Sequence, residues 1–152
     1  MANRKPFPDD LLTTQGVVCA TPEETAELGA QIAADMRVGS VLSLEGPLGA
    51  GKTQLTKGFV KAMGCEAEAS SPSFALLHEY PGGRLPVFHF DFYRMEKAEE
   101  LVTAGYDDCL ADGVTIVEWG DKFPEVLPPG SLRLRLEILP GGGRRITGSW
   151  VL

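Results

Sequence analysis

A glycine-rich segment followed by lysine and threonine carries the clearest chemistry in this 152-residue chain. Such a segment binds phosphate, because its glycines let successive backbone amides point at one anion and the following helix adds the positive end of its dipole. The lysine would place its charge on the outer phosphates, and the threonine hydroxyl would bind Mg²⁺. The residues match the pattern G-x-x-x-x-G-K-[ST] in full: Gly46, Pro47, Leu48, Gly49, Ala50, Gly51, Lys52 and Thr53.

Two acidic residues stand where a phosphate-binding loop needs a partner for Mg²⁺. Asp91 and Glu118 each end a short run that reads as a buried strand. In open α/β sheets, ligands lie outside the carboxyl ends of the strands, so both acids are predicted to point toward the phosphates. The spacing leaves open which acid binds the metal and which positions a water molecule. For each of them the alternative is a helix cap or a surface acid.

Several neighbouring residues admit a functional and a structural interpretation. Ser73 could sense the terminal phosphate from a loop, although an ordinary loop serine is the favoured interpretation. Arg94 could compensate phosphate charge or pair with a nearby acid such as Glu96. Trp119 could line a pocket, but packing is favoured. For His89, which precedes Asp91 in a predicted strand, a hydrogen-bonded structural role is favoured.

These residues need strands that end at the site and a helix that begins there. Residues 40–45 read as a strand before the glycine loop, and residues 54–63 read as the helix after it, closed by Gly64. Thr21, Pro22 and Glu24 together form a typical helix start, with a capping threonine and a capping-box glutamate. The other predicted elements are strands over 16–20, 74–80, 86–90, 114–118, 131–139 and 145–152 and a short helix over 97–104.

The order of these elements predicts the fold class. Buried strands followed by helices favour a mainly parallel sheet. Residues 131–139 alternate leucine with charged residues, and a Pro-Gly-Gly-Gly loop separates them from 145–152, which indicates a hairpin. We therefore expect a three-layer α/β P-loop fold with a mixed, mainly parallel sheet and a C-terminal antiparallel hairpin. We expect one domain over residues 1–152.

Composition limits the partners and the compartment. The net charge of −7 disfavours autonomous binding of nucleic acid, so another protein would have to hold any RNA. Three separated cysteines fit neither a zinc site nor a disulfide framework. No stretch approaches the ~18 apolar residues of a membrane span, and the N-terminus does not resemble a signal peptide. We therefore expect a cytoplasmic protein with no membrane contact.

Four motifs in order resemble the TsaE (YjeE) family, the ATPase of bacterial tRNA threonylcarbamoyladenosine (t6A) biosynthesis. The resemblance covers nearly the whole chain. Besides the glycine loop, it rests on three segments that are similar to the family's T/S-S-P-T-F, H-x-D-L-Y-R and I-E-W motifs: Ser70-Ser71-Pro72-Ser73-Phe74, His89-Phe90-Asp91-Phe92-Tyr93-Arg94 and Val117-Glu118-Trp119. The chain departs from the family pattern at Ser73, Phe92 and Gly120-Asp121, and none of these changes removes a required chemical group.

The resemblance implies specific roles. Asp91 would be an essential acid beside the γ-phosphate, and catalysis would rest on Asp91, Glu118 and Lys52. Thr53 and Glu118 would hold Mg²⁺. Leu48, Gly49, Ala50, Gly51, Lys52 and Thr53 would bind ATP, and Asp91, Pro22 and Arg144 would also reach the nucleotide.

The resemblance also implies partners. The family acts with TsaB and with TsaD, the transferase that modifies A37 of tRNAs reading codons that begin with A. ATP binding and hydrolysis would reset or regulate that complex between turnovers, and tRNA would be contacted only through it.

The residues alone leave two other functions open. A stand-alone P-loop kinase of small molecules would need an acceptor but no protein partner, although no long arginine-rich lid is found. A nucleotide-gated binding module would bind ATP tightly and hydrolyse very little. GTPase specificity of the usual kind is unsupported because the chain has no N-K-x-D motif.

Overall fold

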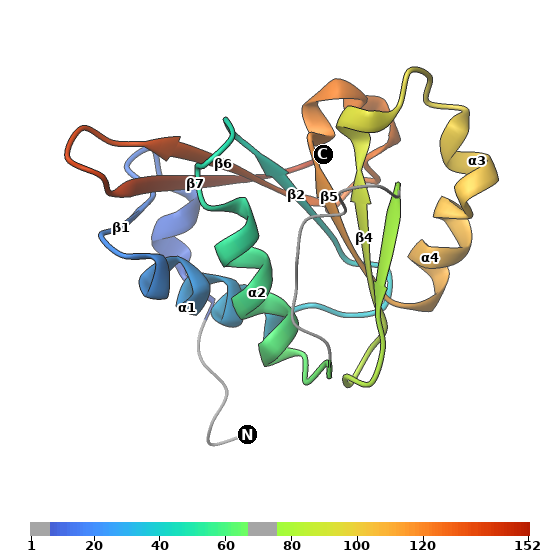
Figure 1. Cartoon of the computed structure of the whole chain (residues 1–152), viewed down its shortest axis with the longest axis horizontal. Coiled ribbons are helices and arrows are strands. Elements are labelled where there is room, and N and C mark those ends of the chain that lie inside the picture. The colour runs from blue at the N-terminus through green and yellow to red at the C-terminus, as the bar shows by residue number, and fades with distance from the viewer. Residues whose placement is uncertain (1–6, 67–75) are drawn as a thin grey trace.

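The computed structural model describes residues 7–66 and 76–152. Figure 1 shows the arrangement of the helices and strands in the molecule. The strands are β1 (Val17–Cys19), β2 (Val41–Glu45), β3 (Leu77–Tyr80), β4 (Val87–Asp91), β5 (Val114–Glu118), β6 (Leu132–Ile138) and β7 (Arg144–Trp150). The α-helices are α1 (Pro22–Ala33), α2 (Lys52–Ala62), α3 (Glu100–Ala104) and α4 (Tyr106–Asp112). The 3₁₀ turns are η1 (Asp9–Leu12), η2 (Phe92–Arg94), η3 (Gly120–Lys122) and η4 (Pro124–Val126).

All seven strands join one sheet in the order β1-β7-β6-β2-β5-β4-β3. The neighbours β6, β2, β5 and β4 pair in parallel, whereas β1–β7, β7–β6 and β4–β3 pair antiparallel. Five strands therefore point one way, and only β3 and β7 oppose them. This confirms the predicted mixed, mainly parallel sheet with its C-terminal hairpin.

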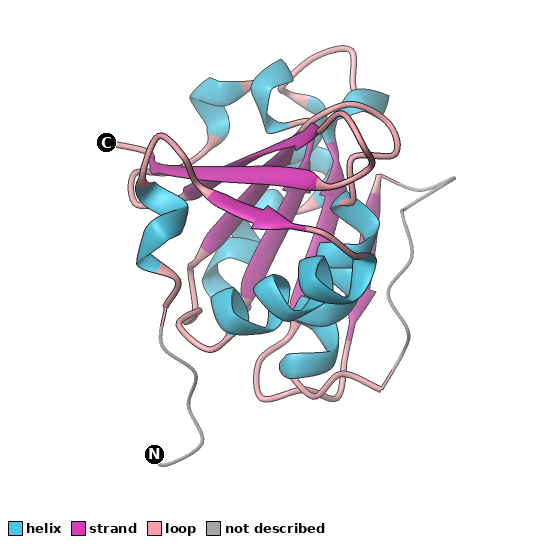
Figure 2. Cartoon of the chain, turned by 90° about the vertical axis from the view of Figure 1, so that its left-hand side faces the viewer, coloured by secondary structure: helices cyan, strands magenta, loops and turns pink. Residues whose placement is uncertain are grey.

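Helices cover both faces of the sheet, which makes three layers (Figures 1 and 2). Helices α1 and α2 pack on one face, and α3 and α4 pack on the other. Each face has its own cluster of buried apolar side chains. Leu28, Ile32, Leu55, Phe59, Leu42 and Ile116 belong to the first cluster, and Phe90, Phe92, Leu101, Tyr106, Cys109 and Val117 to the second.

Helix α1 begins as its sequence predicts. The Thr21 hydroxyl accepts a hydrogen bond from the Glu24 amide at 3.2 Å. The Glu24 carboxylate accepts one from the amide of Ala20 at 2.6 Å, one residue before the cap. These two bonds satisfy amides that a helix start otherwise leaves without partners. They also fix where Pro22 lies relative to the sheet.

Helices α1 and α2 cross at two glycines. A methyl group built on Gly58 would lie 1.8 Å from the carbonyl oxygen of Ala26. One built on Gly29 would lie 2.1 Å from the carbonyl oxygen of Leu55. Each helix therefore touches the backbone of the other, and no larger residue fits at either position without moving them apart.

Some element boundaries differ from the sequence prediction. Helix α2 begins at Lys52 rather than at residue 54, because Gly51 adopts a left-handed conformation as its N-cap. The predicted helix 97–104 begins only at Glu100. Helix α4 was not predicted, because Gly105 reads as a helix end; its left-handed φ of 77° ends α3 and starts α4.

Within the described residues, no helix has the length and apolar character needed to cross a membrane.

Candidate functional site

The glycine loop turns sharply from β2 into α2. Its glycines Gly46, Gly49 and Gly51 have φ values of 151°, 83° and 103°, which L side chains rarely adopt. Gly46 also lies so close to β6 that a methyl group there would sit 2.5 Å from the carbonyl oxygen of Leu136. The turn leaves Lys52 and Thr53 as the first two residues of α2, where the helix dipole favours an anion.

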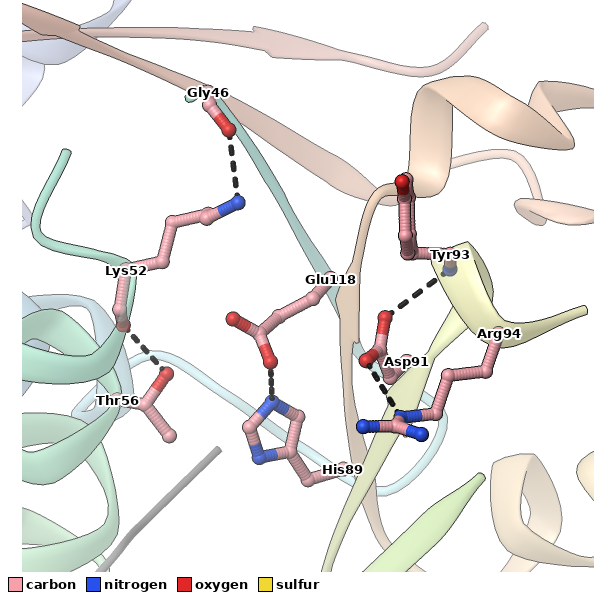
Figure 3. A network of polar contacts seen from close by, with 8 residues as sticks. All are labelled: Gly46, Lys52, Thr56, His89, Asp91, Tyr93, Arg94 and Glu118. Carbon is pink, nitrogen blue, oxygen red and sulfur yellow. Dashed lines mark hydrogen bonds and ion pairs between the residues drawn. The ribbon is translucent and has the colours of Figure 1, made fainter. Parts of the chain in front are cut away.

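The Lys52 side chain crosses the mouth of this loop. Its Nζ donates a 2.8 Å hydrogen bond to the carbonyl oxygen of Gly46 (Figure 3). The same Nζ lies 4.0 Å from the centre of the Trp119 ring. Thr56 holds the start of the helix by donating a 2.8 Å bond to the Lys52 carbonyl. Burial lowers the pKa of the Lys52 amine, and nearby carboxylates, Glu118 first, oppose that effect. The buried Lys52 amine therefore lies at the loop before any phosphate binds.

Glu118 is buried at the end of β5, next to the P-loop strand. One of its carboxylate oxygens, Oε2, lies 3.0 Å from Nε2 of the buried His89 (Figure 3). His89 therefore has the hydrogen-bonded structural role that was favoured from the sequence. Because the imidazole holds one carboxylate oxygen, the Glu118 side chain is oriented before any ligand binds.

Asp91 ends β4 and stands opposite Glu118 in the parallel register of β4 and β5. Its carboxylate accepts a hydrogen bond from the Tyr93 amide at 3.1 Å and pairs with Arg94 Nε at 3.4 Å (Figure 3). Burial raises the pKa of Asp91; the Tyr93 amide acts against this, and Glu118 adds to it. Arg94 was expected to contact phosphate or an acid such as Glu96, and the structure pairs it with Asp91.

A cleft of about 630 Å³ brings most of the predicted site residues together. Its size lies within the range of ordinary ligand pockets, roughly 300–1,000 Å³. Ala50 is the one loop residue of the predicted set that does not line it, because its side chain is fully buried in the core. The cleft is lined by Leu48, Gly49, Gly51, Lys52, Thr53, Gln54, Asp91, Tyr93, Glu118 and Trp119.

Pro22 and Arg144 lie elsewhere, beside a second cavity of about 120 Å³. This cavity shares Gly49, Gly51 and Gln54 with the large cleft, so the two meet at the glycine loop. Arg144 donates a 3.0 Å hydrogen bond to the carbonyl oxygen of Gly49, which ties the β6–β7 hairpin to the loop. The predicted residues therefore form two groups on either side of one loop.

Trp119 both packs and lines the cleft. It has a left-handed backbone with φ of 61°, unique among the non-glycine residues that the structure describes. Its ring lies 5.2 Å from that of Tyr93, and its amide donates to the Leu44 carbonyl at 3.1 Å. Such a conformation is uncommon in a bulky residue and is typical of functional sites. Both interpretations open from the sequence therefore hold: Trp119 packs, as favoured, and it also lines the cleft.

The structure adds lining residues that the sequence did not indicate. Gln54 lies on the first turn of α2 and borders both cavities. Its position one turn after Gly51 was the only available signal. For Tyr93 the sequence offers only its position two residues after Asp91. Ser73, the candidate sensor of a terminal phosphate, lies outside the described residues.

The cleft has the chemistry of a magnesium–phosphate site. Mg²⁺ prefers oxygen ligands and usually takes one or two from protein, with the remainder from phosphate and water. Thr53 and the buried, pre-oriented Glu118 offer such oxygens within one cleft, beside a loop built for an anion. Within 7–66 and 76–152, no group of three His, Cys, Asp or Glu side chains forms an all-protein metal site. The donor set therefore fits Mg²⁺ held jointly with a phosphate ligand.

Comparison with known proteins gives a consistent result. Two curated relatives are tRNA threonylcarbamoyladenosine biosynthesis proteins TsaE. The Bacillus subtilis protein is 41% identical over 127 residues, covering 83% of this chain and 79% of its own length. The Treponema pallidum protein is 36% identical over 131 residues, covering 86% and 96%. The crystal structure of Bacillus subtilis YdiB superposes with a TM-score of 0.73 at 35% identity, covering 90% of this chain and 84% of that one.

A family model spans most of the described chain. The model for threonylcarbamoyl adenosine biosynthesis protein TsaE matches residues 19–146, from the end of β1 to the middle of β7. The match includes the glycine loop, both acids and Arg144. On this evidence and the architecture above, the chain belongs to the TsaE family.

Proposed function

We propose that this protein binds Mg²⁺ and ATP at the glycine loop and hydrolyses ATP in support of t6A formation at A37 of tRNA. One observation carries the proposal: a single cleft unites the first turn of α2, with Lys52 and Thr53, and the paired strand ends that present Asp91 and Glu118. Membership of the TsaE family supports the link to t6A biosynthesis.

In this proposal the loop holds the phosphates and the acids prepare the reaction. Amides of the glycine loop and the ammonium of Lys52 bind the phosphate oxygens, while Thr53 and Glu118 hold Mg²⁺. When bound, Mg²⁺ neutralises charge that develops on the transferred phosphoryl group. Asp91 orients the attacking water, and a pKa raised by burial suits a group that accepts a proton.

The second cavity accommodates a further part of the nucleotide. It adjoins the glycine loop, and Pro22 and Arg144 border it. Arg144 already contacts the loop through Gly49 and is therefore held where it meets a ligand on the loop. Trp119 and Tyr93 form an aromatic wall on the opposite side, which limits access of water to the phosphates.

TsaB and TsaD are the proposed partners, in the cytoplasm. The net charge of −7 makes this chain a poor carrier of tRNA by itself, so the RNA would be held by the partner proteins.

The test is ATP hydrolysis by the protein alone and after addition of purified TsaB and TsaD. We expect slow basal turnover that the two partners accelerate.

A matched pair of variants assigns the turnover to this site. Asp91→Asn should abolish the stimulated hydrolysis, whereas Asp9→Asn should retain it, because Asp9 is an exposed acid in η1 that lines neither cavity at the glycine loop. Turnover that TsaB and TsaD leave unchanged would contradict the partnership. Equal activity of the two variants would contradict the role of Asp91.

A further inference from the structure

An apolar groove lies on the other face of the sheet from α1 and α2. Residues of α3, α4 and η4 border it, and its volume is about 340 Å³. Figure 1 shows α3 and α4 on this side of the sheet. Val102 stands at its edge with 80% of its surface exposed. Leu101, Leu110 and Val126 also line it, and Asp107 is its one charged lining residue. It shares no lining residue with either cavity at the glycine loop.

The surface around this groove is strongly acidic. Residues 96–112 contain six acids and one lysine, a charge of −5, whereas the remaining 135 residues contribute −2 to the total of −7. All six acids are exposed. A surface of this kind repels the phosphates of RNA and of anionic lipids and attracts lysine and arginine.

Only some of these acids stabilise their own helices. Asp107 and Asp108 lie in the first turn of α4, where the helix dipole favours an acid. Glu100 accepts hydrogen bonds from two backbone amides and serves as a local cap. In contrast, Asp108 and Asp112 are like charges four residues apart on α4, and Asp112 stands at the C-terminal end, where the helix dipole favours a cation. A positively charged partner would offset the repulsion at this end of α4.

The floor of the groove is connected to the candidate catalytic strand. The Tyr106 ring lies 5.3 Å from that of Phe90 and 6.0 Å from that of Phe92, the two residues that flank Asp91. The Tyr106 hydroxyl donates a 3.1 Å hydrogen bond to the carbonyl oxygen of Val126 on the opposite wall. A molecule in the groove would therefore rest on the aromatic layer that supports Asp91.

We propose that the groove between α3, α4 and η4 docks an amphipathic helix of a partner protein, with apolar side chains in the groove and lysine or arginine facing the acids. Helix-in-groove recognition uses this combination of an apolar floor and a charged rim. The proposal does not depend on the nucleotide site, since the two surfaces have separate linings.

The test uses two fluorescently labelled amphipathic helical peptides, one of leucine and lysine and the other of leucine and glutamate, titrated against the full chain by anisotropy. We expect the lysine peptide to bind at least about tenfold more tightly. Val102→Ser should weaken binding of the lysine peptide about tenfold, because the peptide would no longer bury one valine side chain. Val18→Ser is the matched control, because Val18 is also exposed but lies on β1, at the far edge of the sheet.

Equal affinity for both peptides, no binding of the lysine peptide, or equal effects of the two valine variants would each overturn the proposal. The double variant Asp107→Asn, Asp108→Asn should also weaken binding of the lysine peptide. The fold should stay intact, since both side chains are exposed. Lys52→Met should leave peptide binding unchanged; a loss there would place the peptide in the nucleotide cleft instead and refute the groove.

Discussion

Replacement of Lys52 by methionine separates ligand binding from folding. The ammonium has three donors, and one of them already binds the carbonyl oxygen of Gly46. Two remain for phosphate oxygens, each worth about 1.5–3 kcal/mol as a charge-assisted hydrogen bond. Losing the contact with the Trp119 ring on binding would cost about 0.5–2 kcal/mol. The central net gain is therefore about 2–4 kcal/mol.

The lost phosphate contacts should lower the affinity for Mg-ATP strongly, whereas the stability of the fold should change little. At about 1.4 kcal/mol per factor of ten, Lys52→Met should raise the Kd for Mg-ATP roughly 30- to 700-fold. Because burial lowers the pKa of Lys52, its charged form is less stable in the folded protein than in the unfolded chain. Methionine keeps the apolar stem but loses the hydrogen bond to Gly46. Since these effects oppose each other, the free energy of unfolding should change by no more than about 1.5 kcal/mol.

Calorimetric titration with Mg-ATP and urea denaturation measure the two quantities. Lys61→Met is the matched control, because it removes the same charge from the exposed end of the same helix. Its Kd should remain within about threefold of the original protein. An Mg-ATP affinity of Lys52→Met that is equally unchanged would refute the phosphate-binding role of the loop.

Four further substitutions test other parts of the structure. Glu118→Gln should raise the Mg²⁺ concentration needed for hydrolysis at least about tenfold in a metal titration, and no change would move the metal to Asp91. Asp91→Asn should stabilise the protein against urea at pH 7, because burial raises the pKa of Asp91 above 3.8 and its charged form is disfavoured in the fold; the gain should vanish below about pH 4, where the unfolded chain is also protonated. Gly58→Ala should cost at least about 2 kcal/mol of unfolding free energy, since its methyl group meets the Ala26 carbonyl, and wild-type stability would contradict that contact. Tyr106→Phe should cost about 1 kcal/mol by losing the hydrogen bond to Val126, and an unaltered urea midpoint would show that the bond contributes nothing.

Local sequence patterns predicted the elements that depend on local chemistry. The capping box at Thr21, the glycine loop and the alternating strand 131–139 each carry their own signal, and each appears in the structure. The strand ends also predicted that Asp91 and Glu118 would meet, because parallel strands end at one edge.

Features that arise from tertiary contacts were not predictable in this way. Helix α4 has only seven residues, which is too short a segment to show the apolar periodicity of a helix. The bond between His89 and Glu118 joins residues 29 positions apart, so no spacing rule reveals it. The same holds for the contact between Arg144 and Gly49, which depends on where the hairpin folds back.

The backbone contact of α1 with α2 has a mechanical consequence. Pro22 begins one helix and Lys52 begins the other, and at the glycine crossing the two helices pack backbone against backbone. The two cavities share Gly49, Gly51 and Gln54 at the start of α2. A shift of α1 would have to carry α2 with it, so this shared wall and Pro22 would move together. Any rearrangement between ligand states would then fall to the walls on the sheet side, the hairpin that carries Arg144 and the turn that carries Trp119.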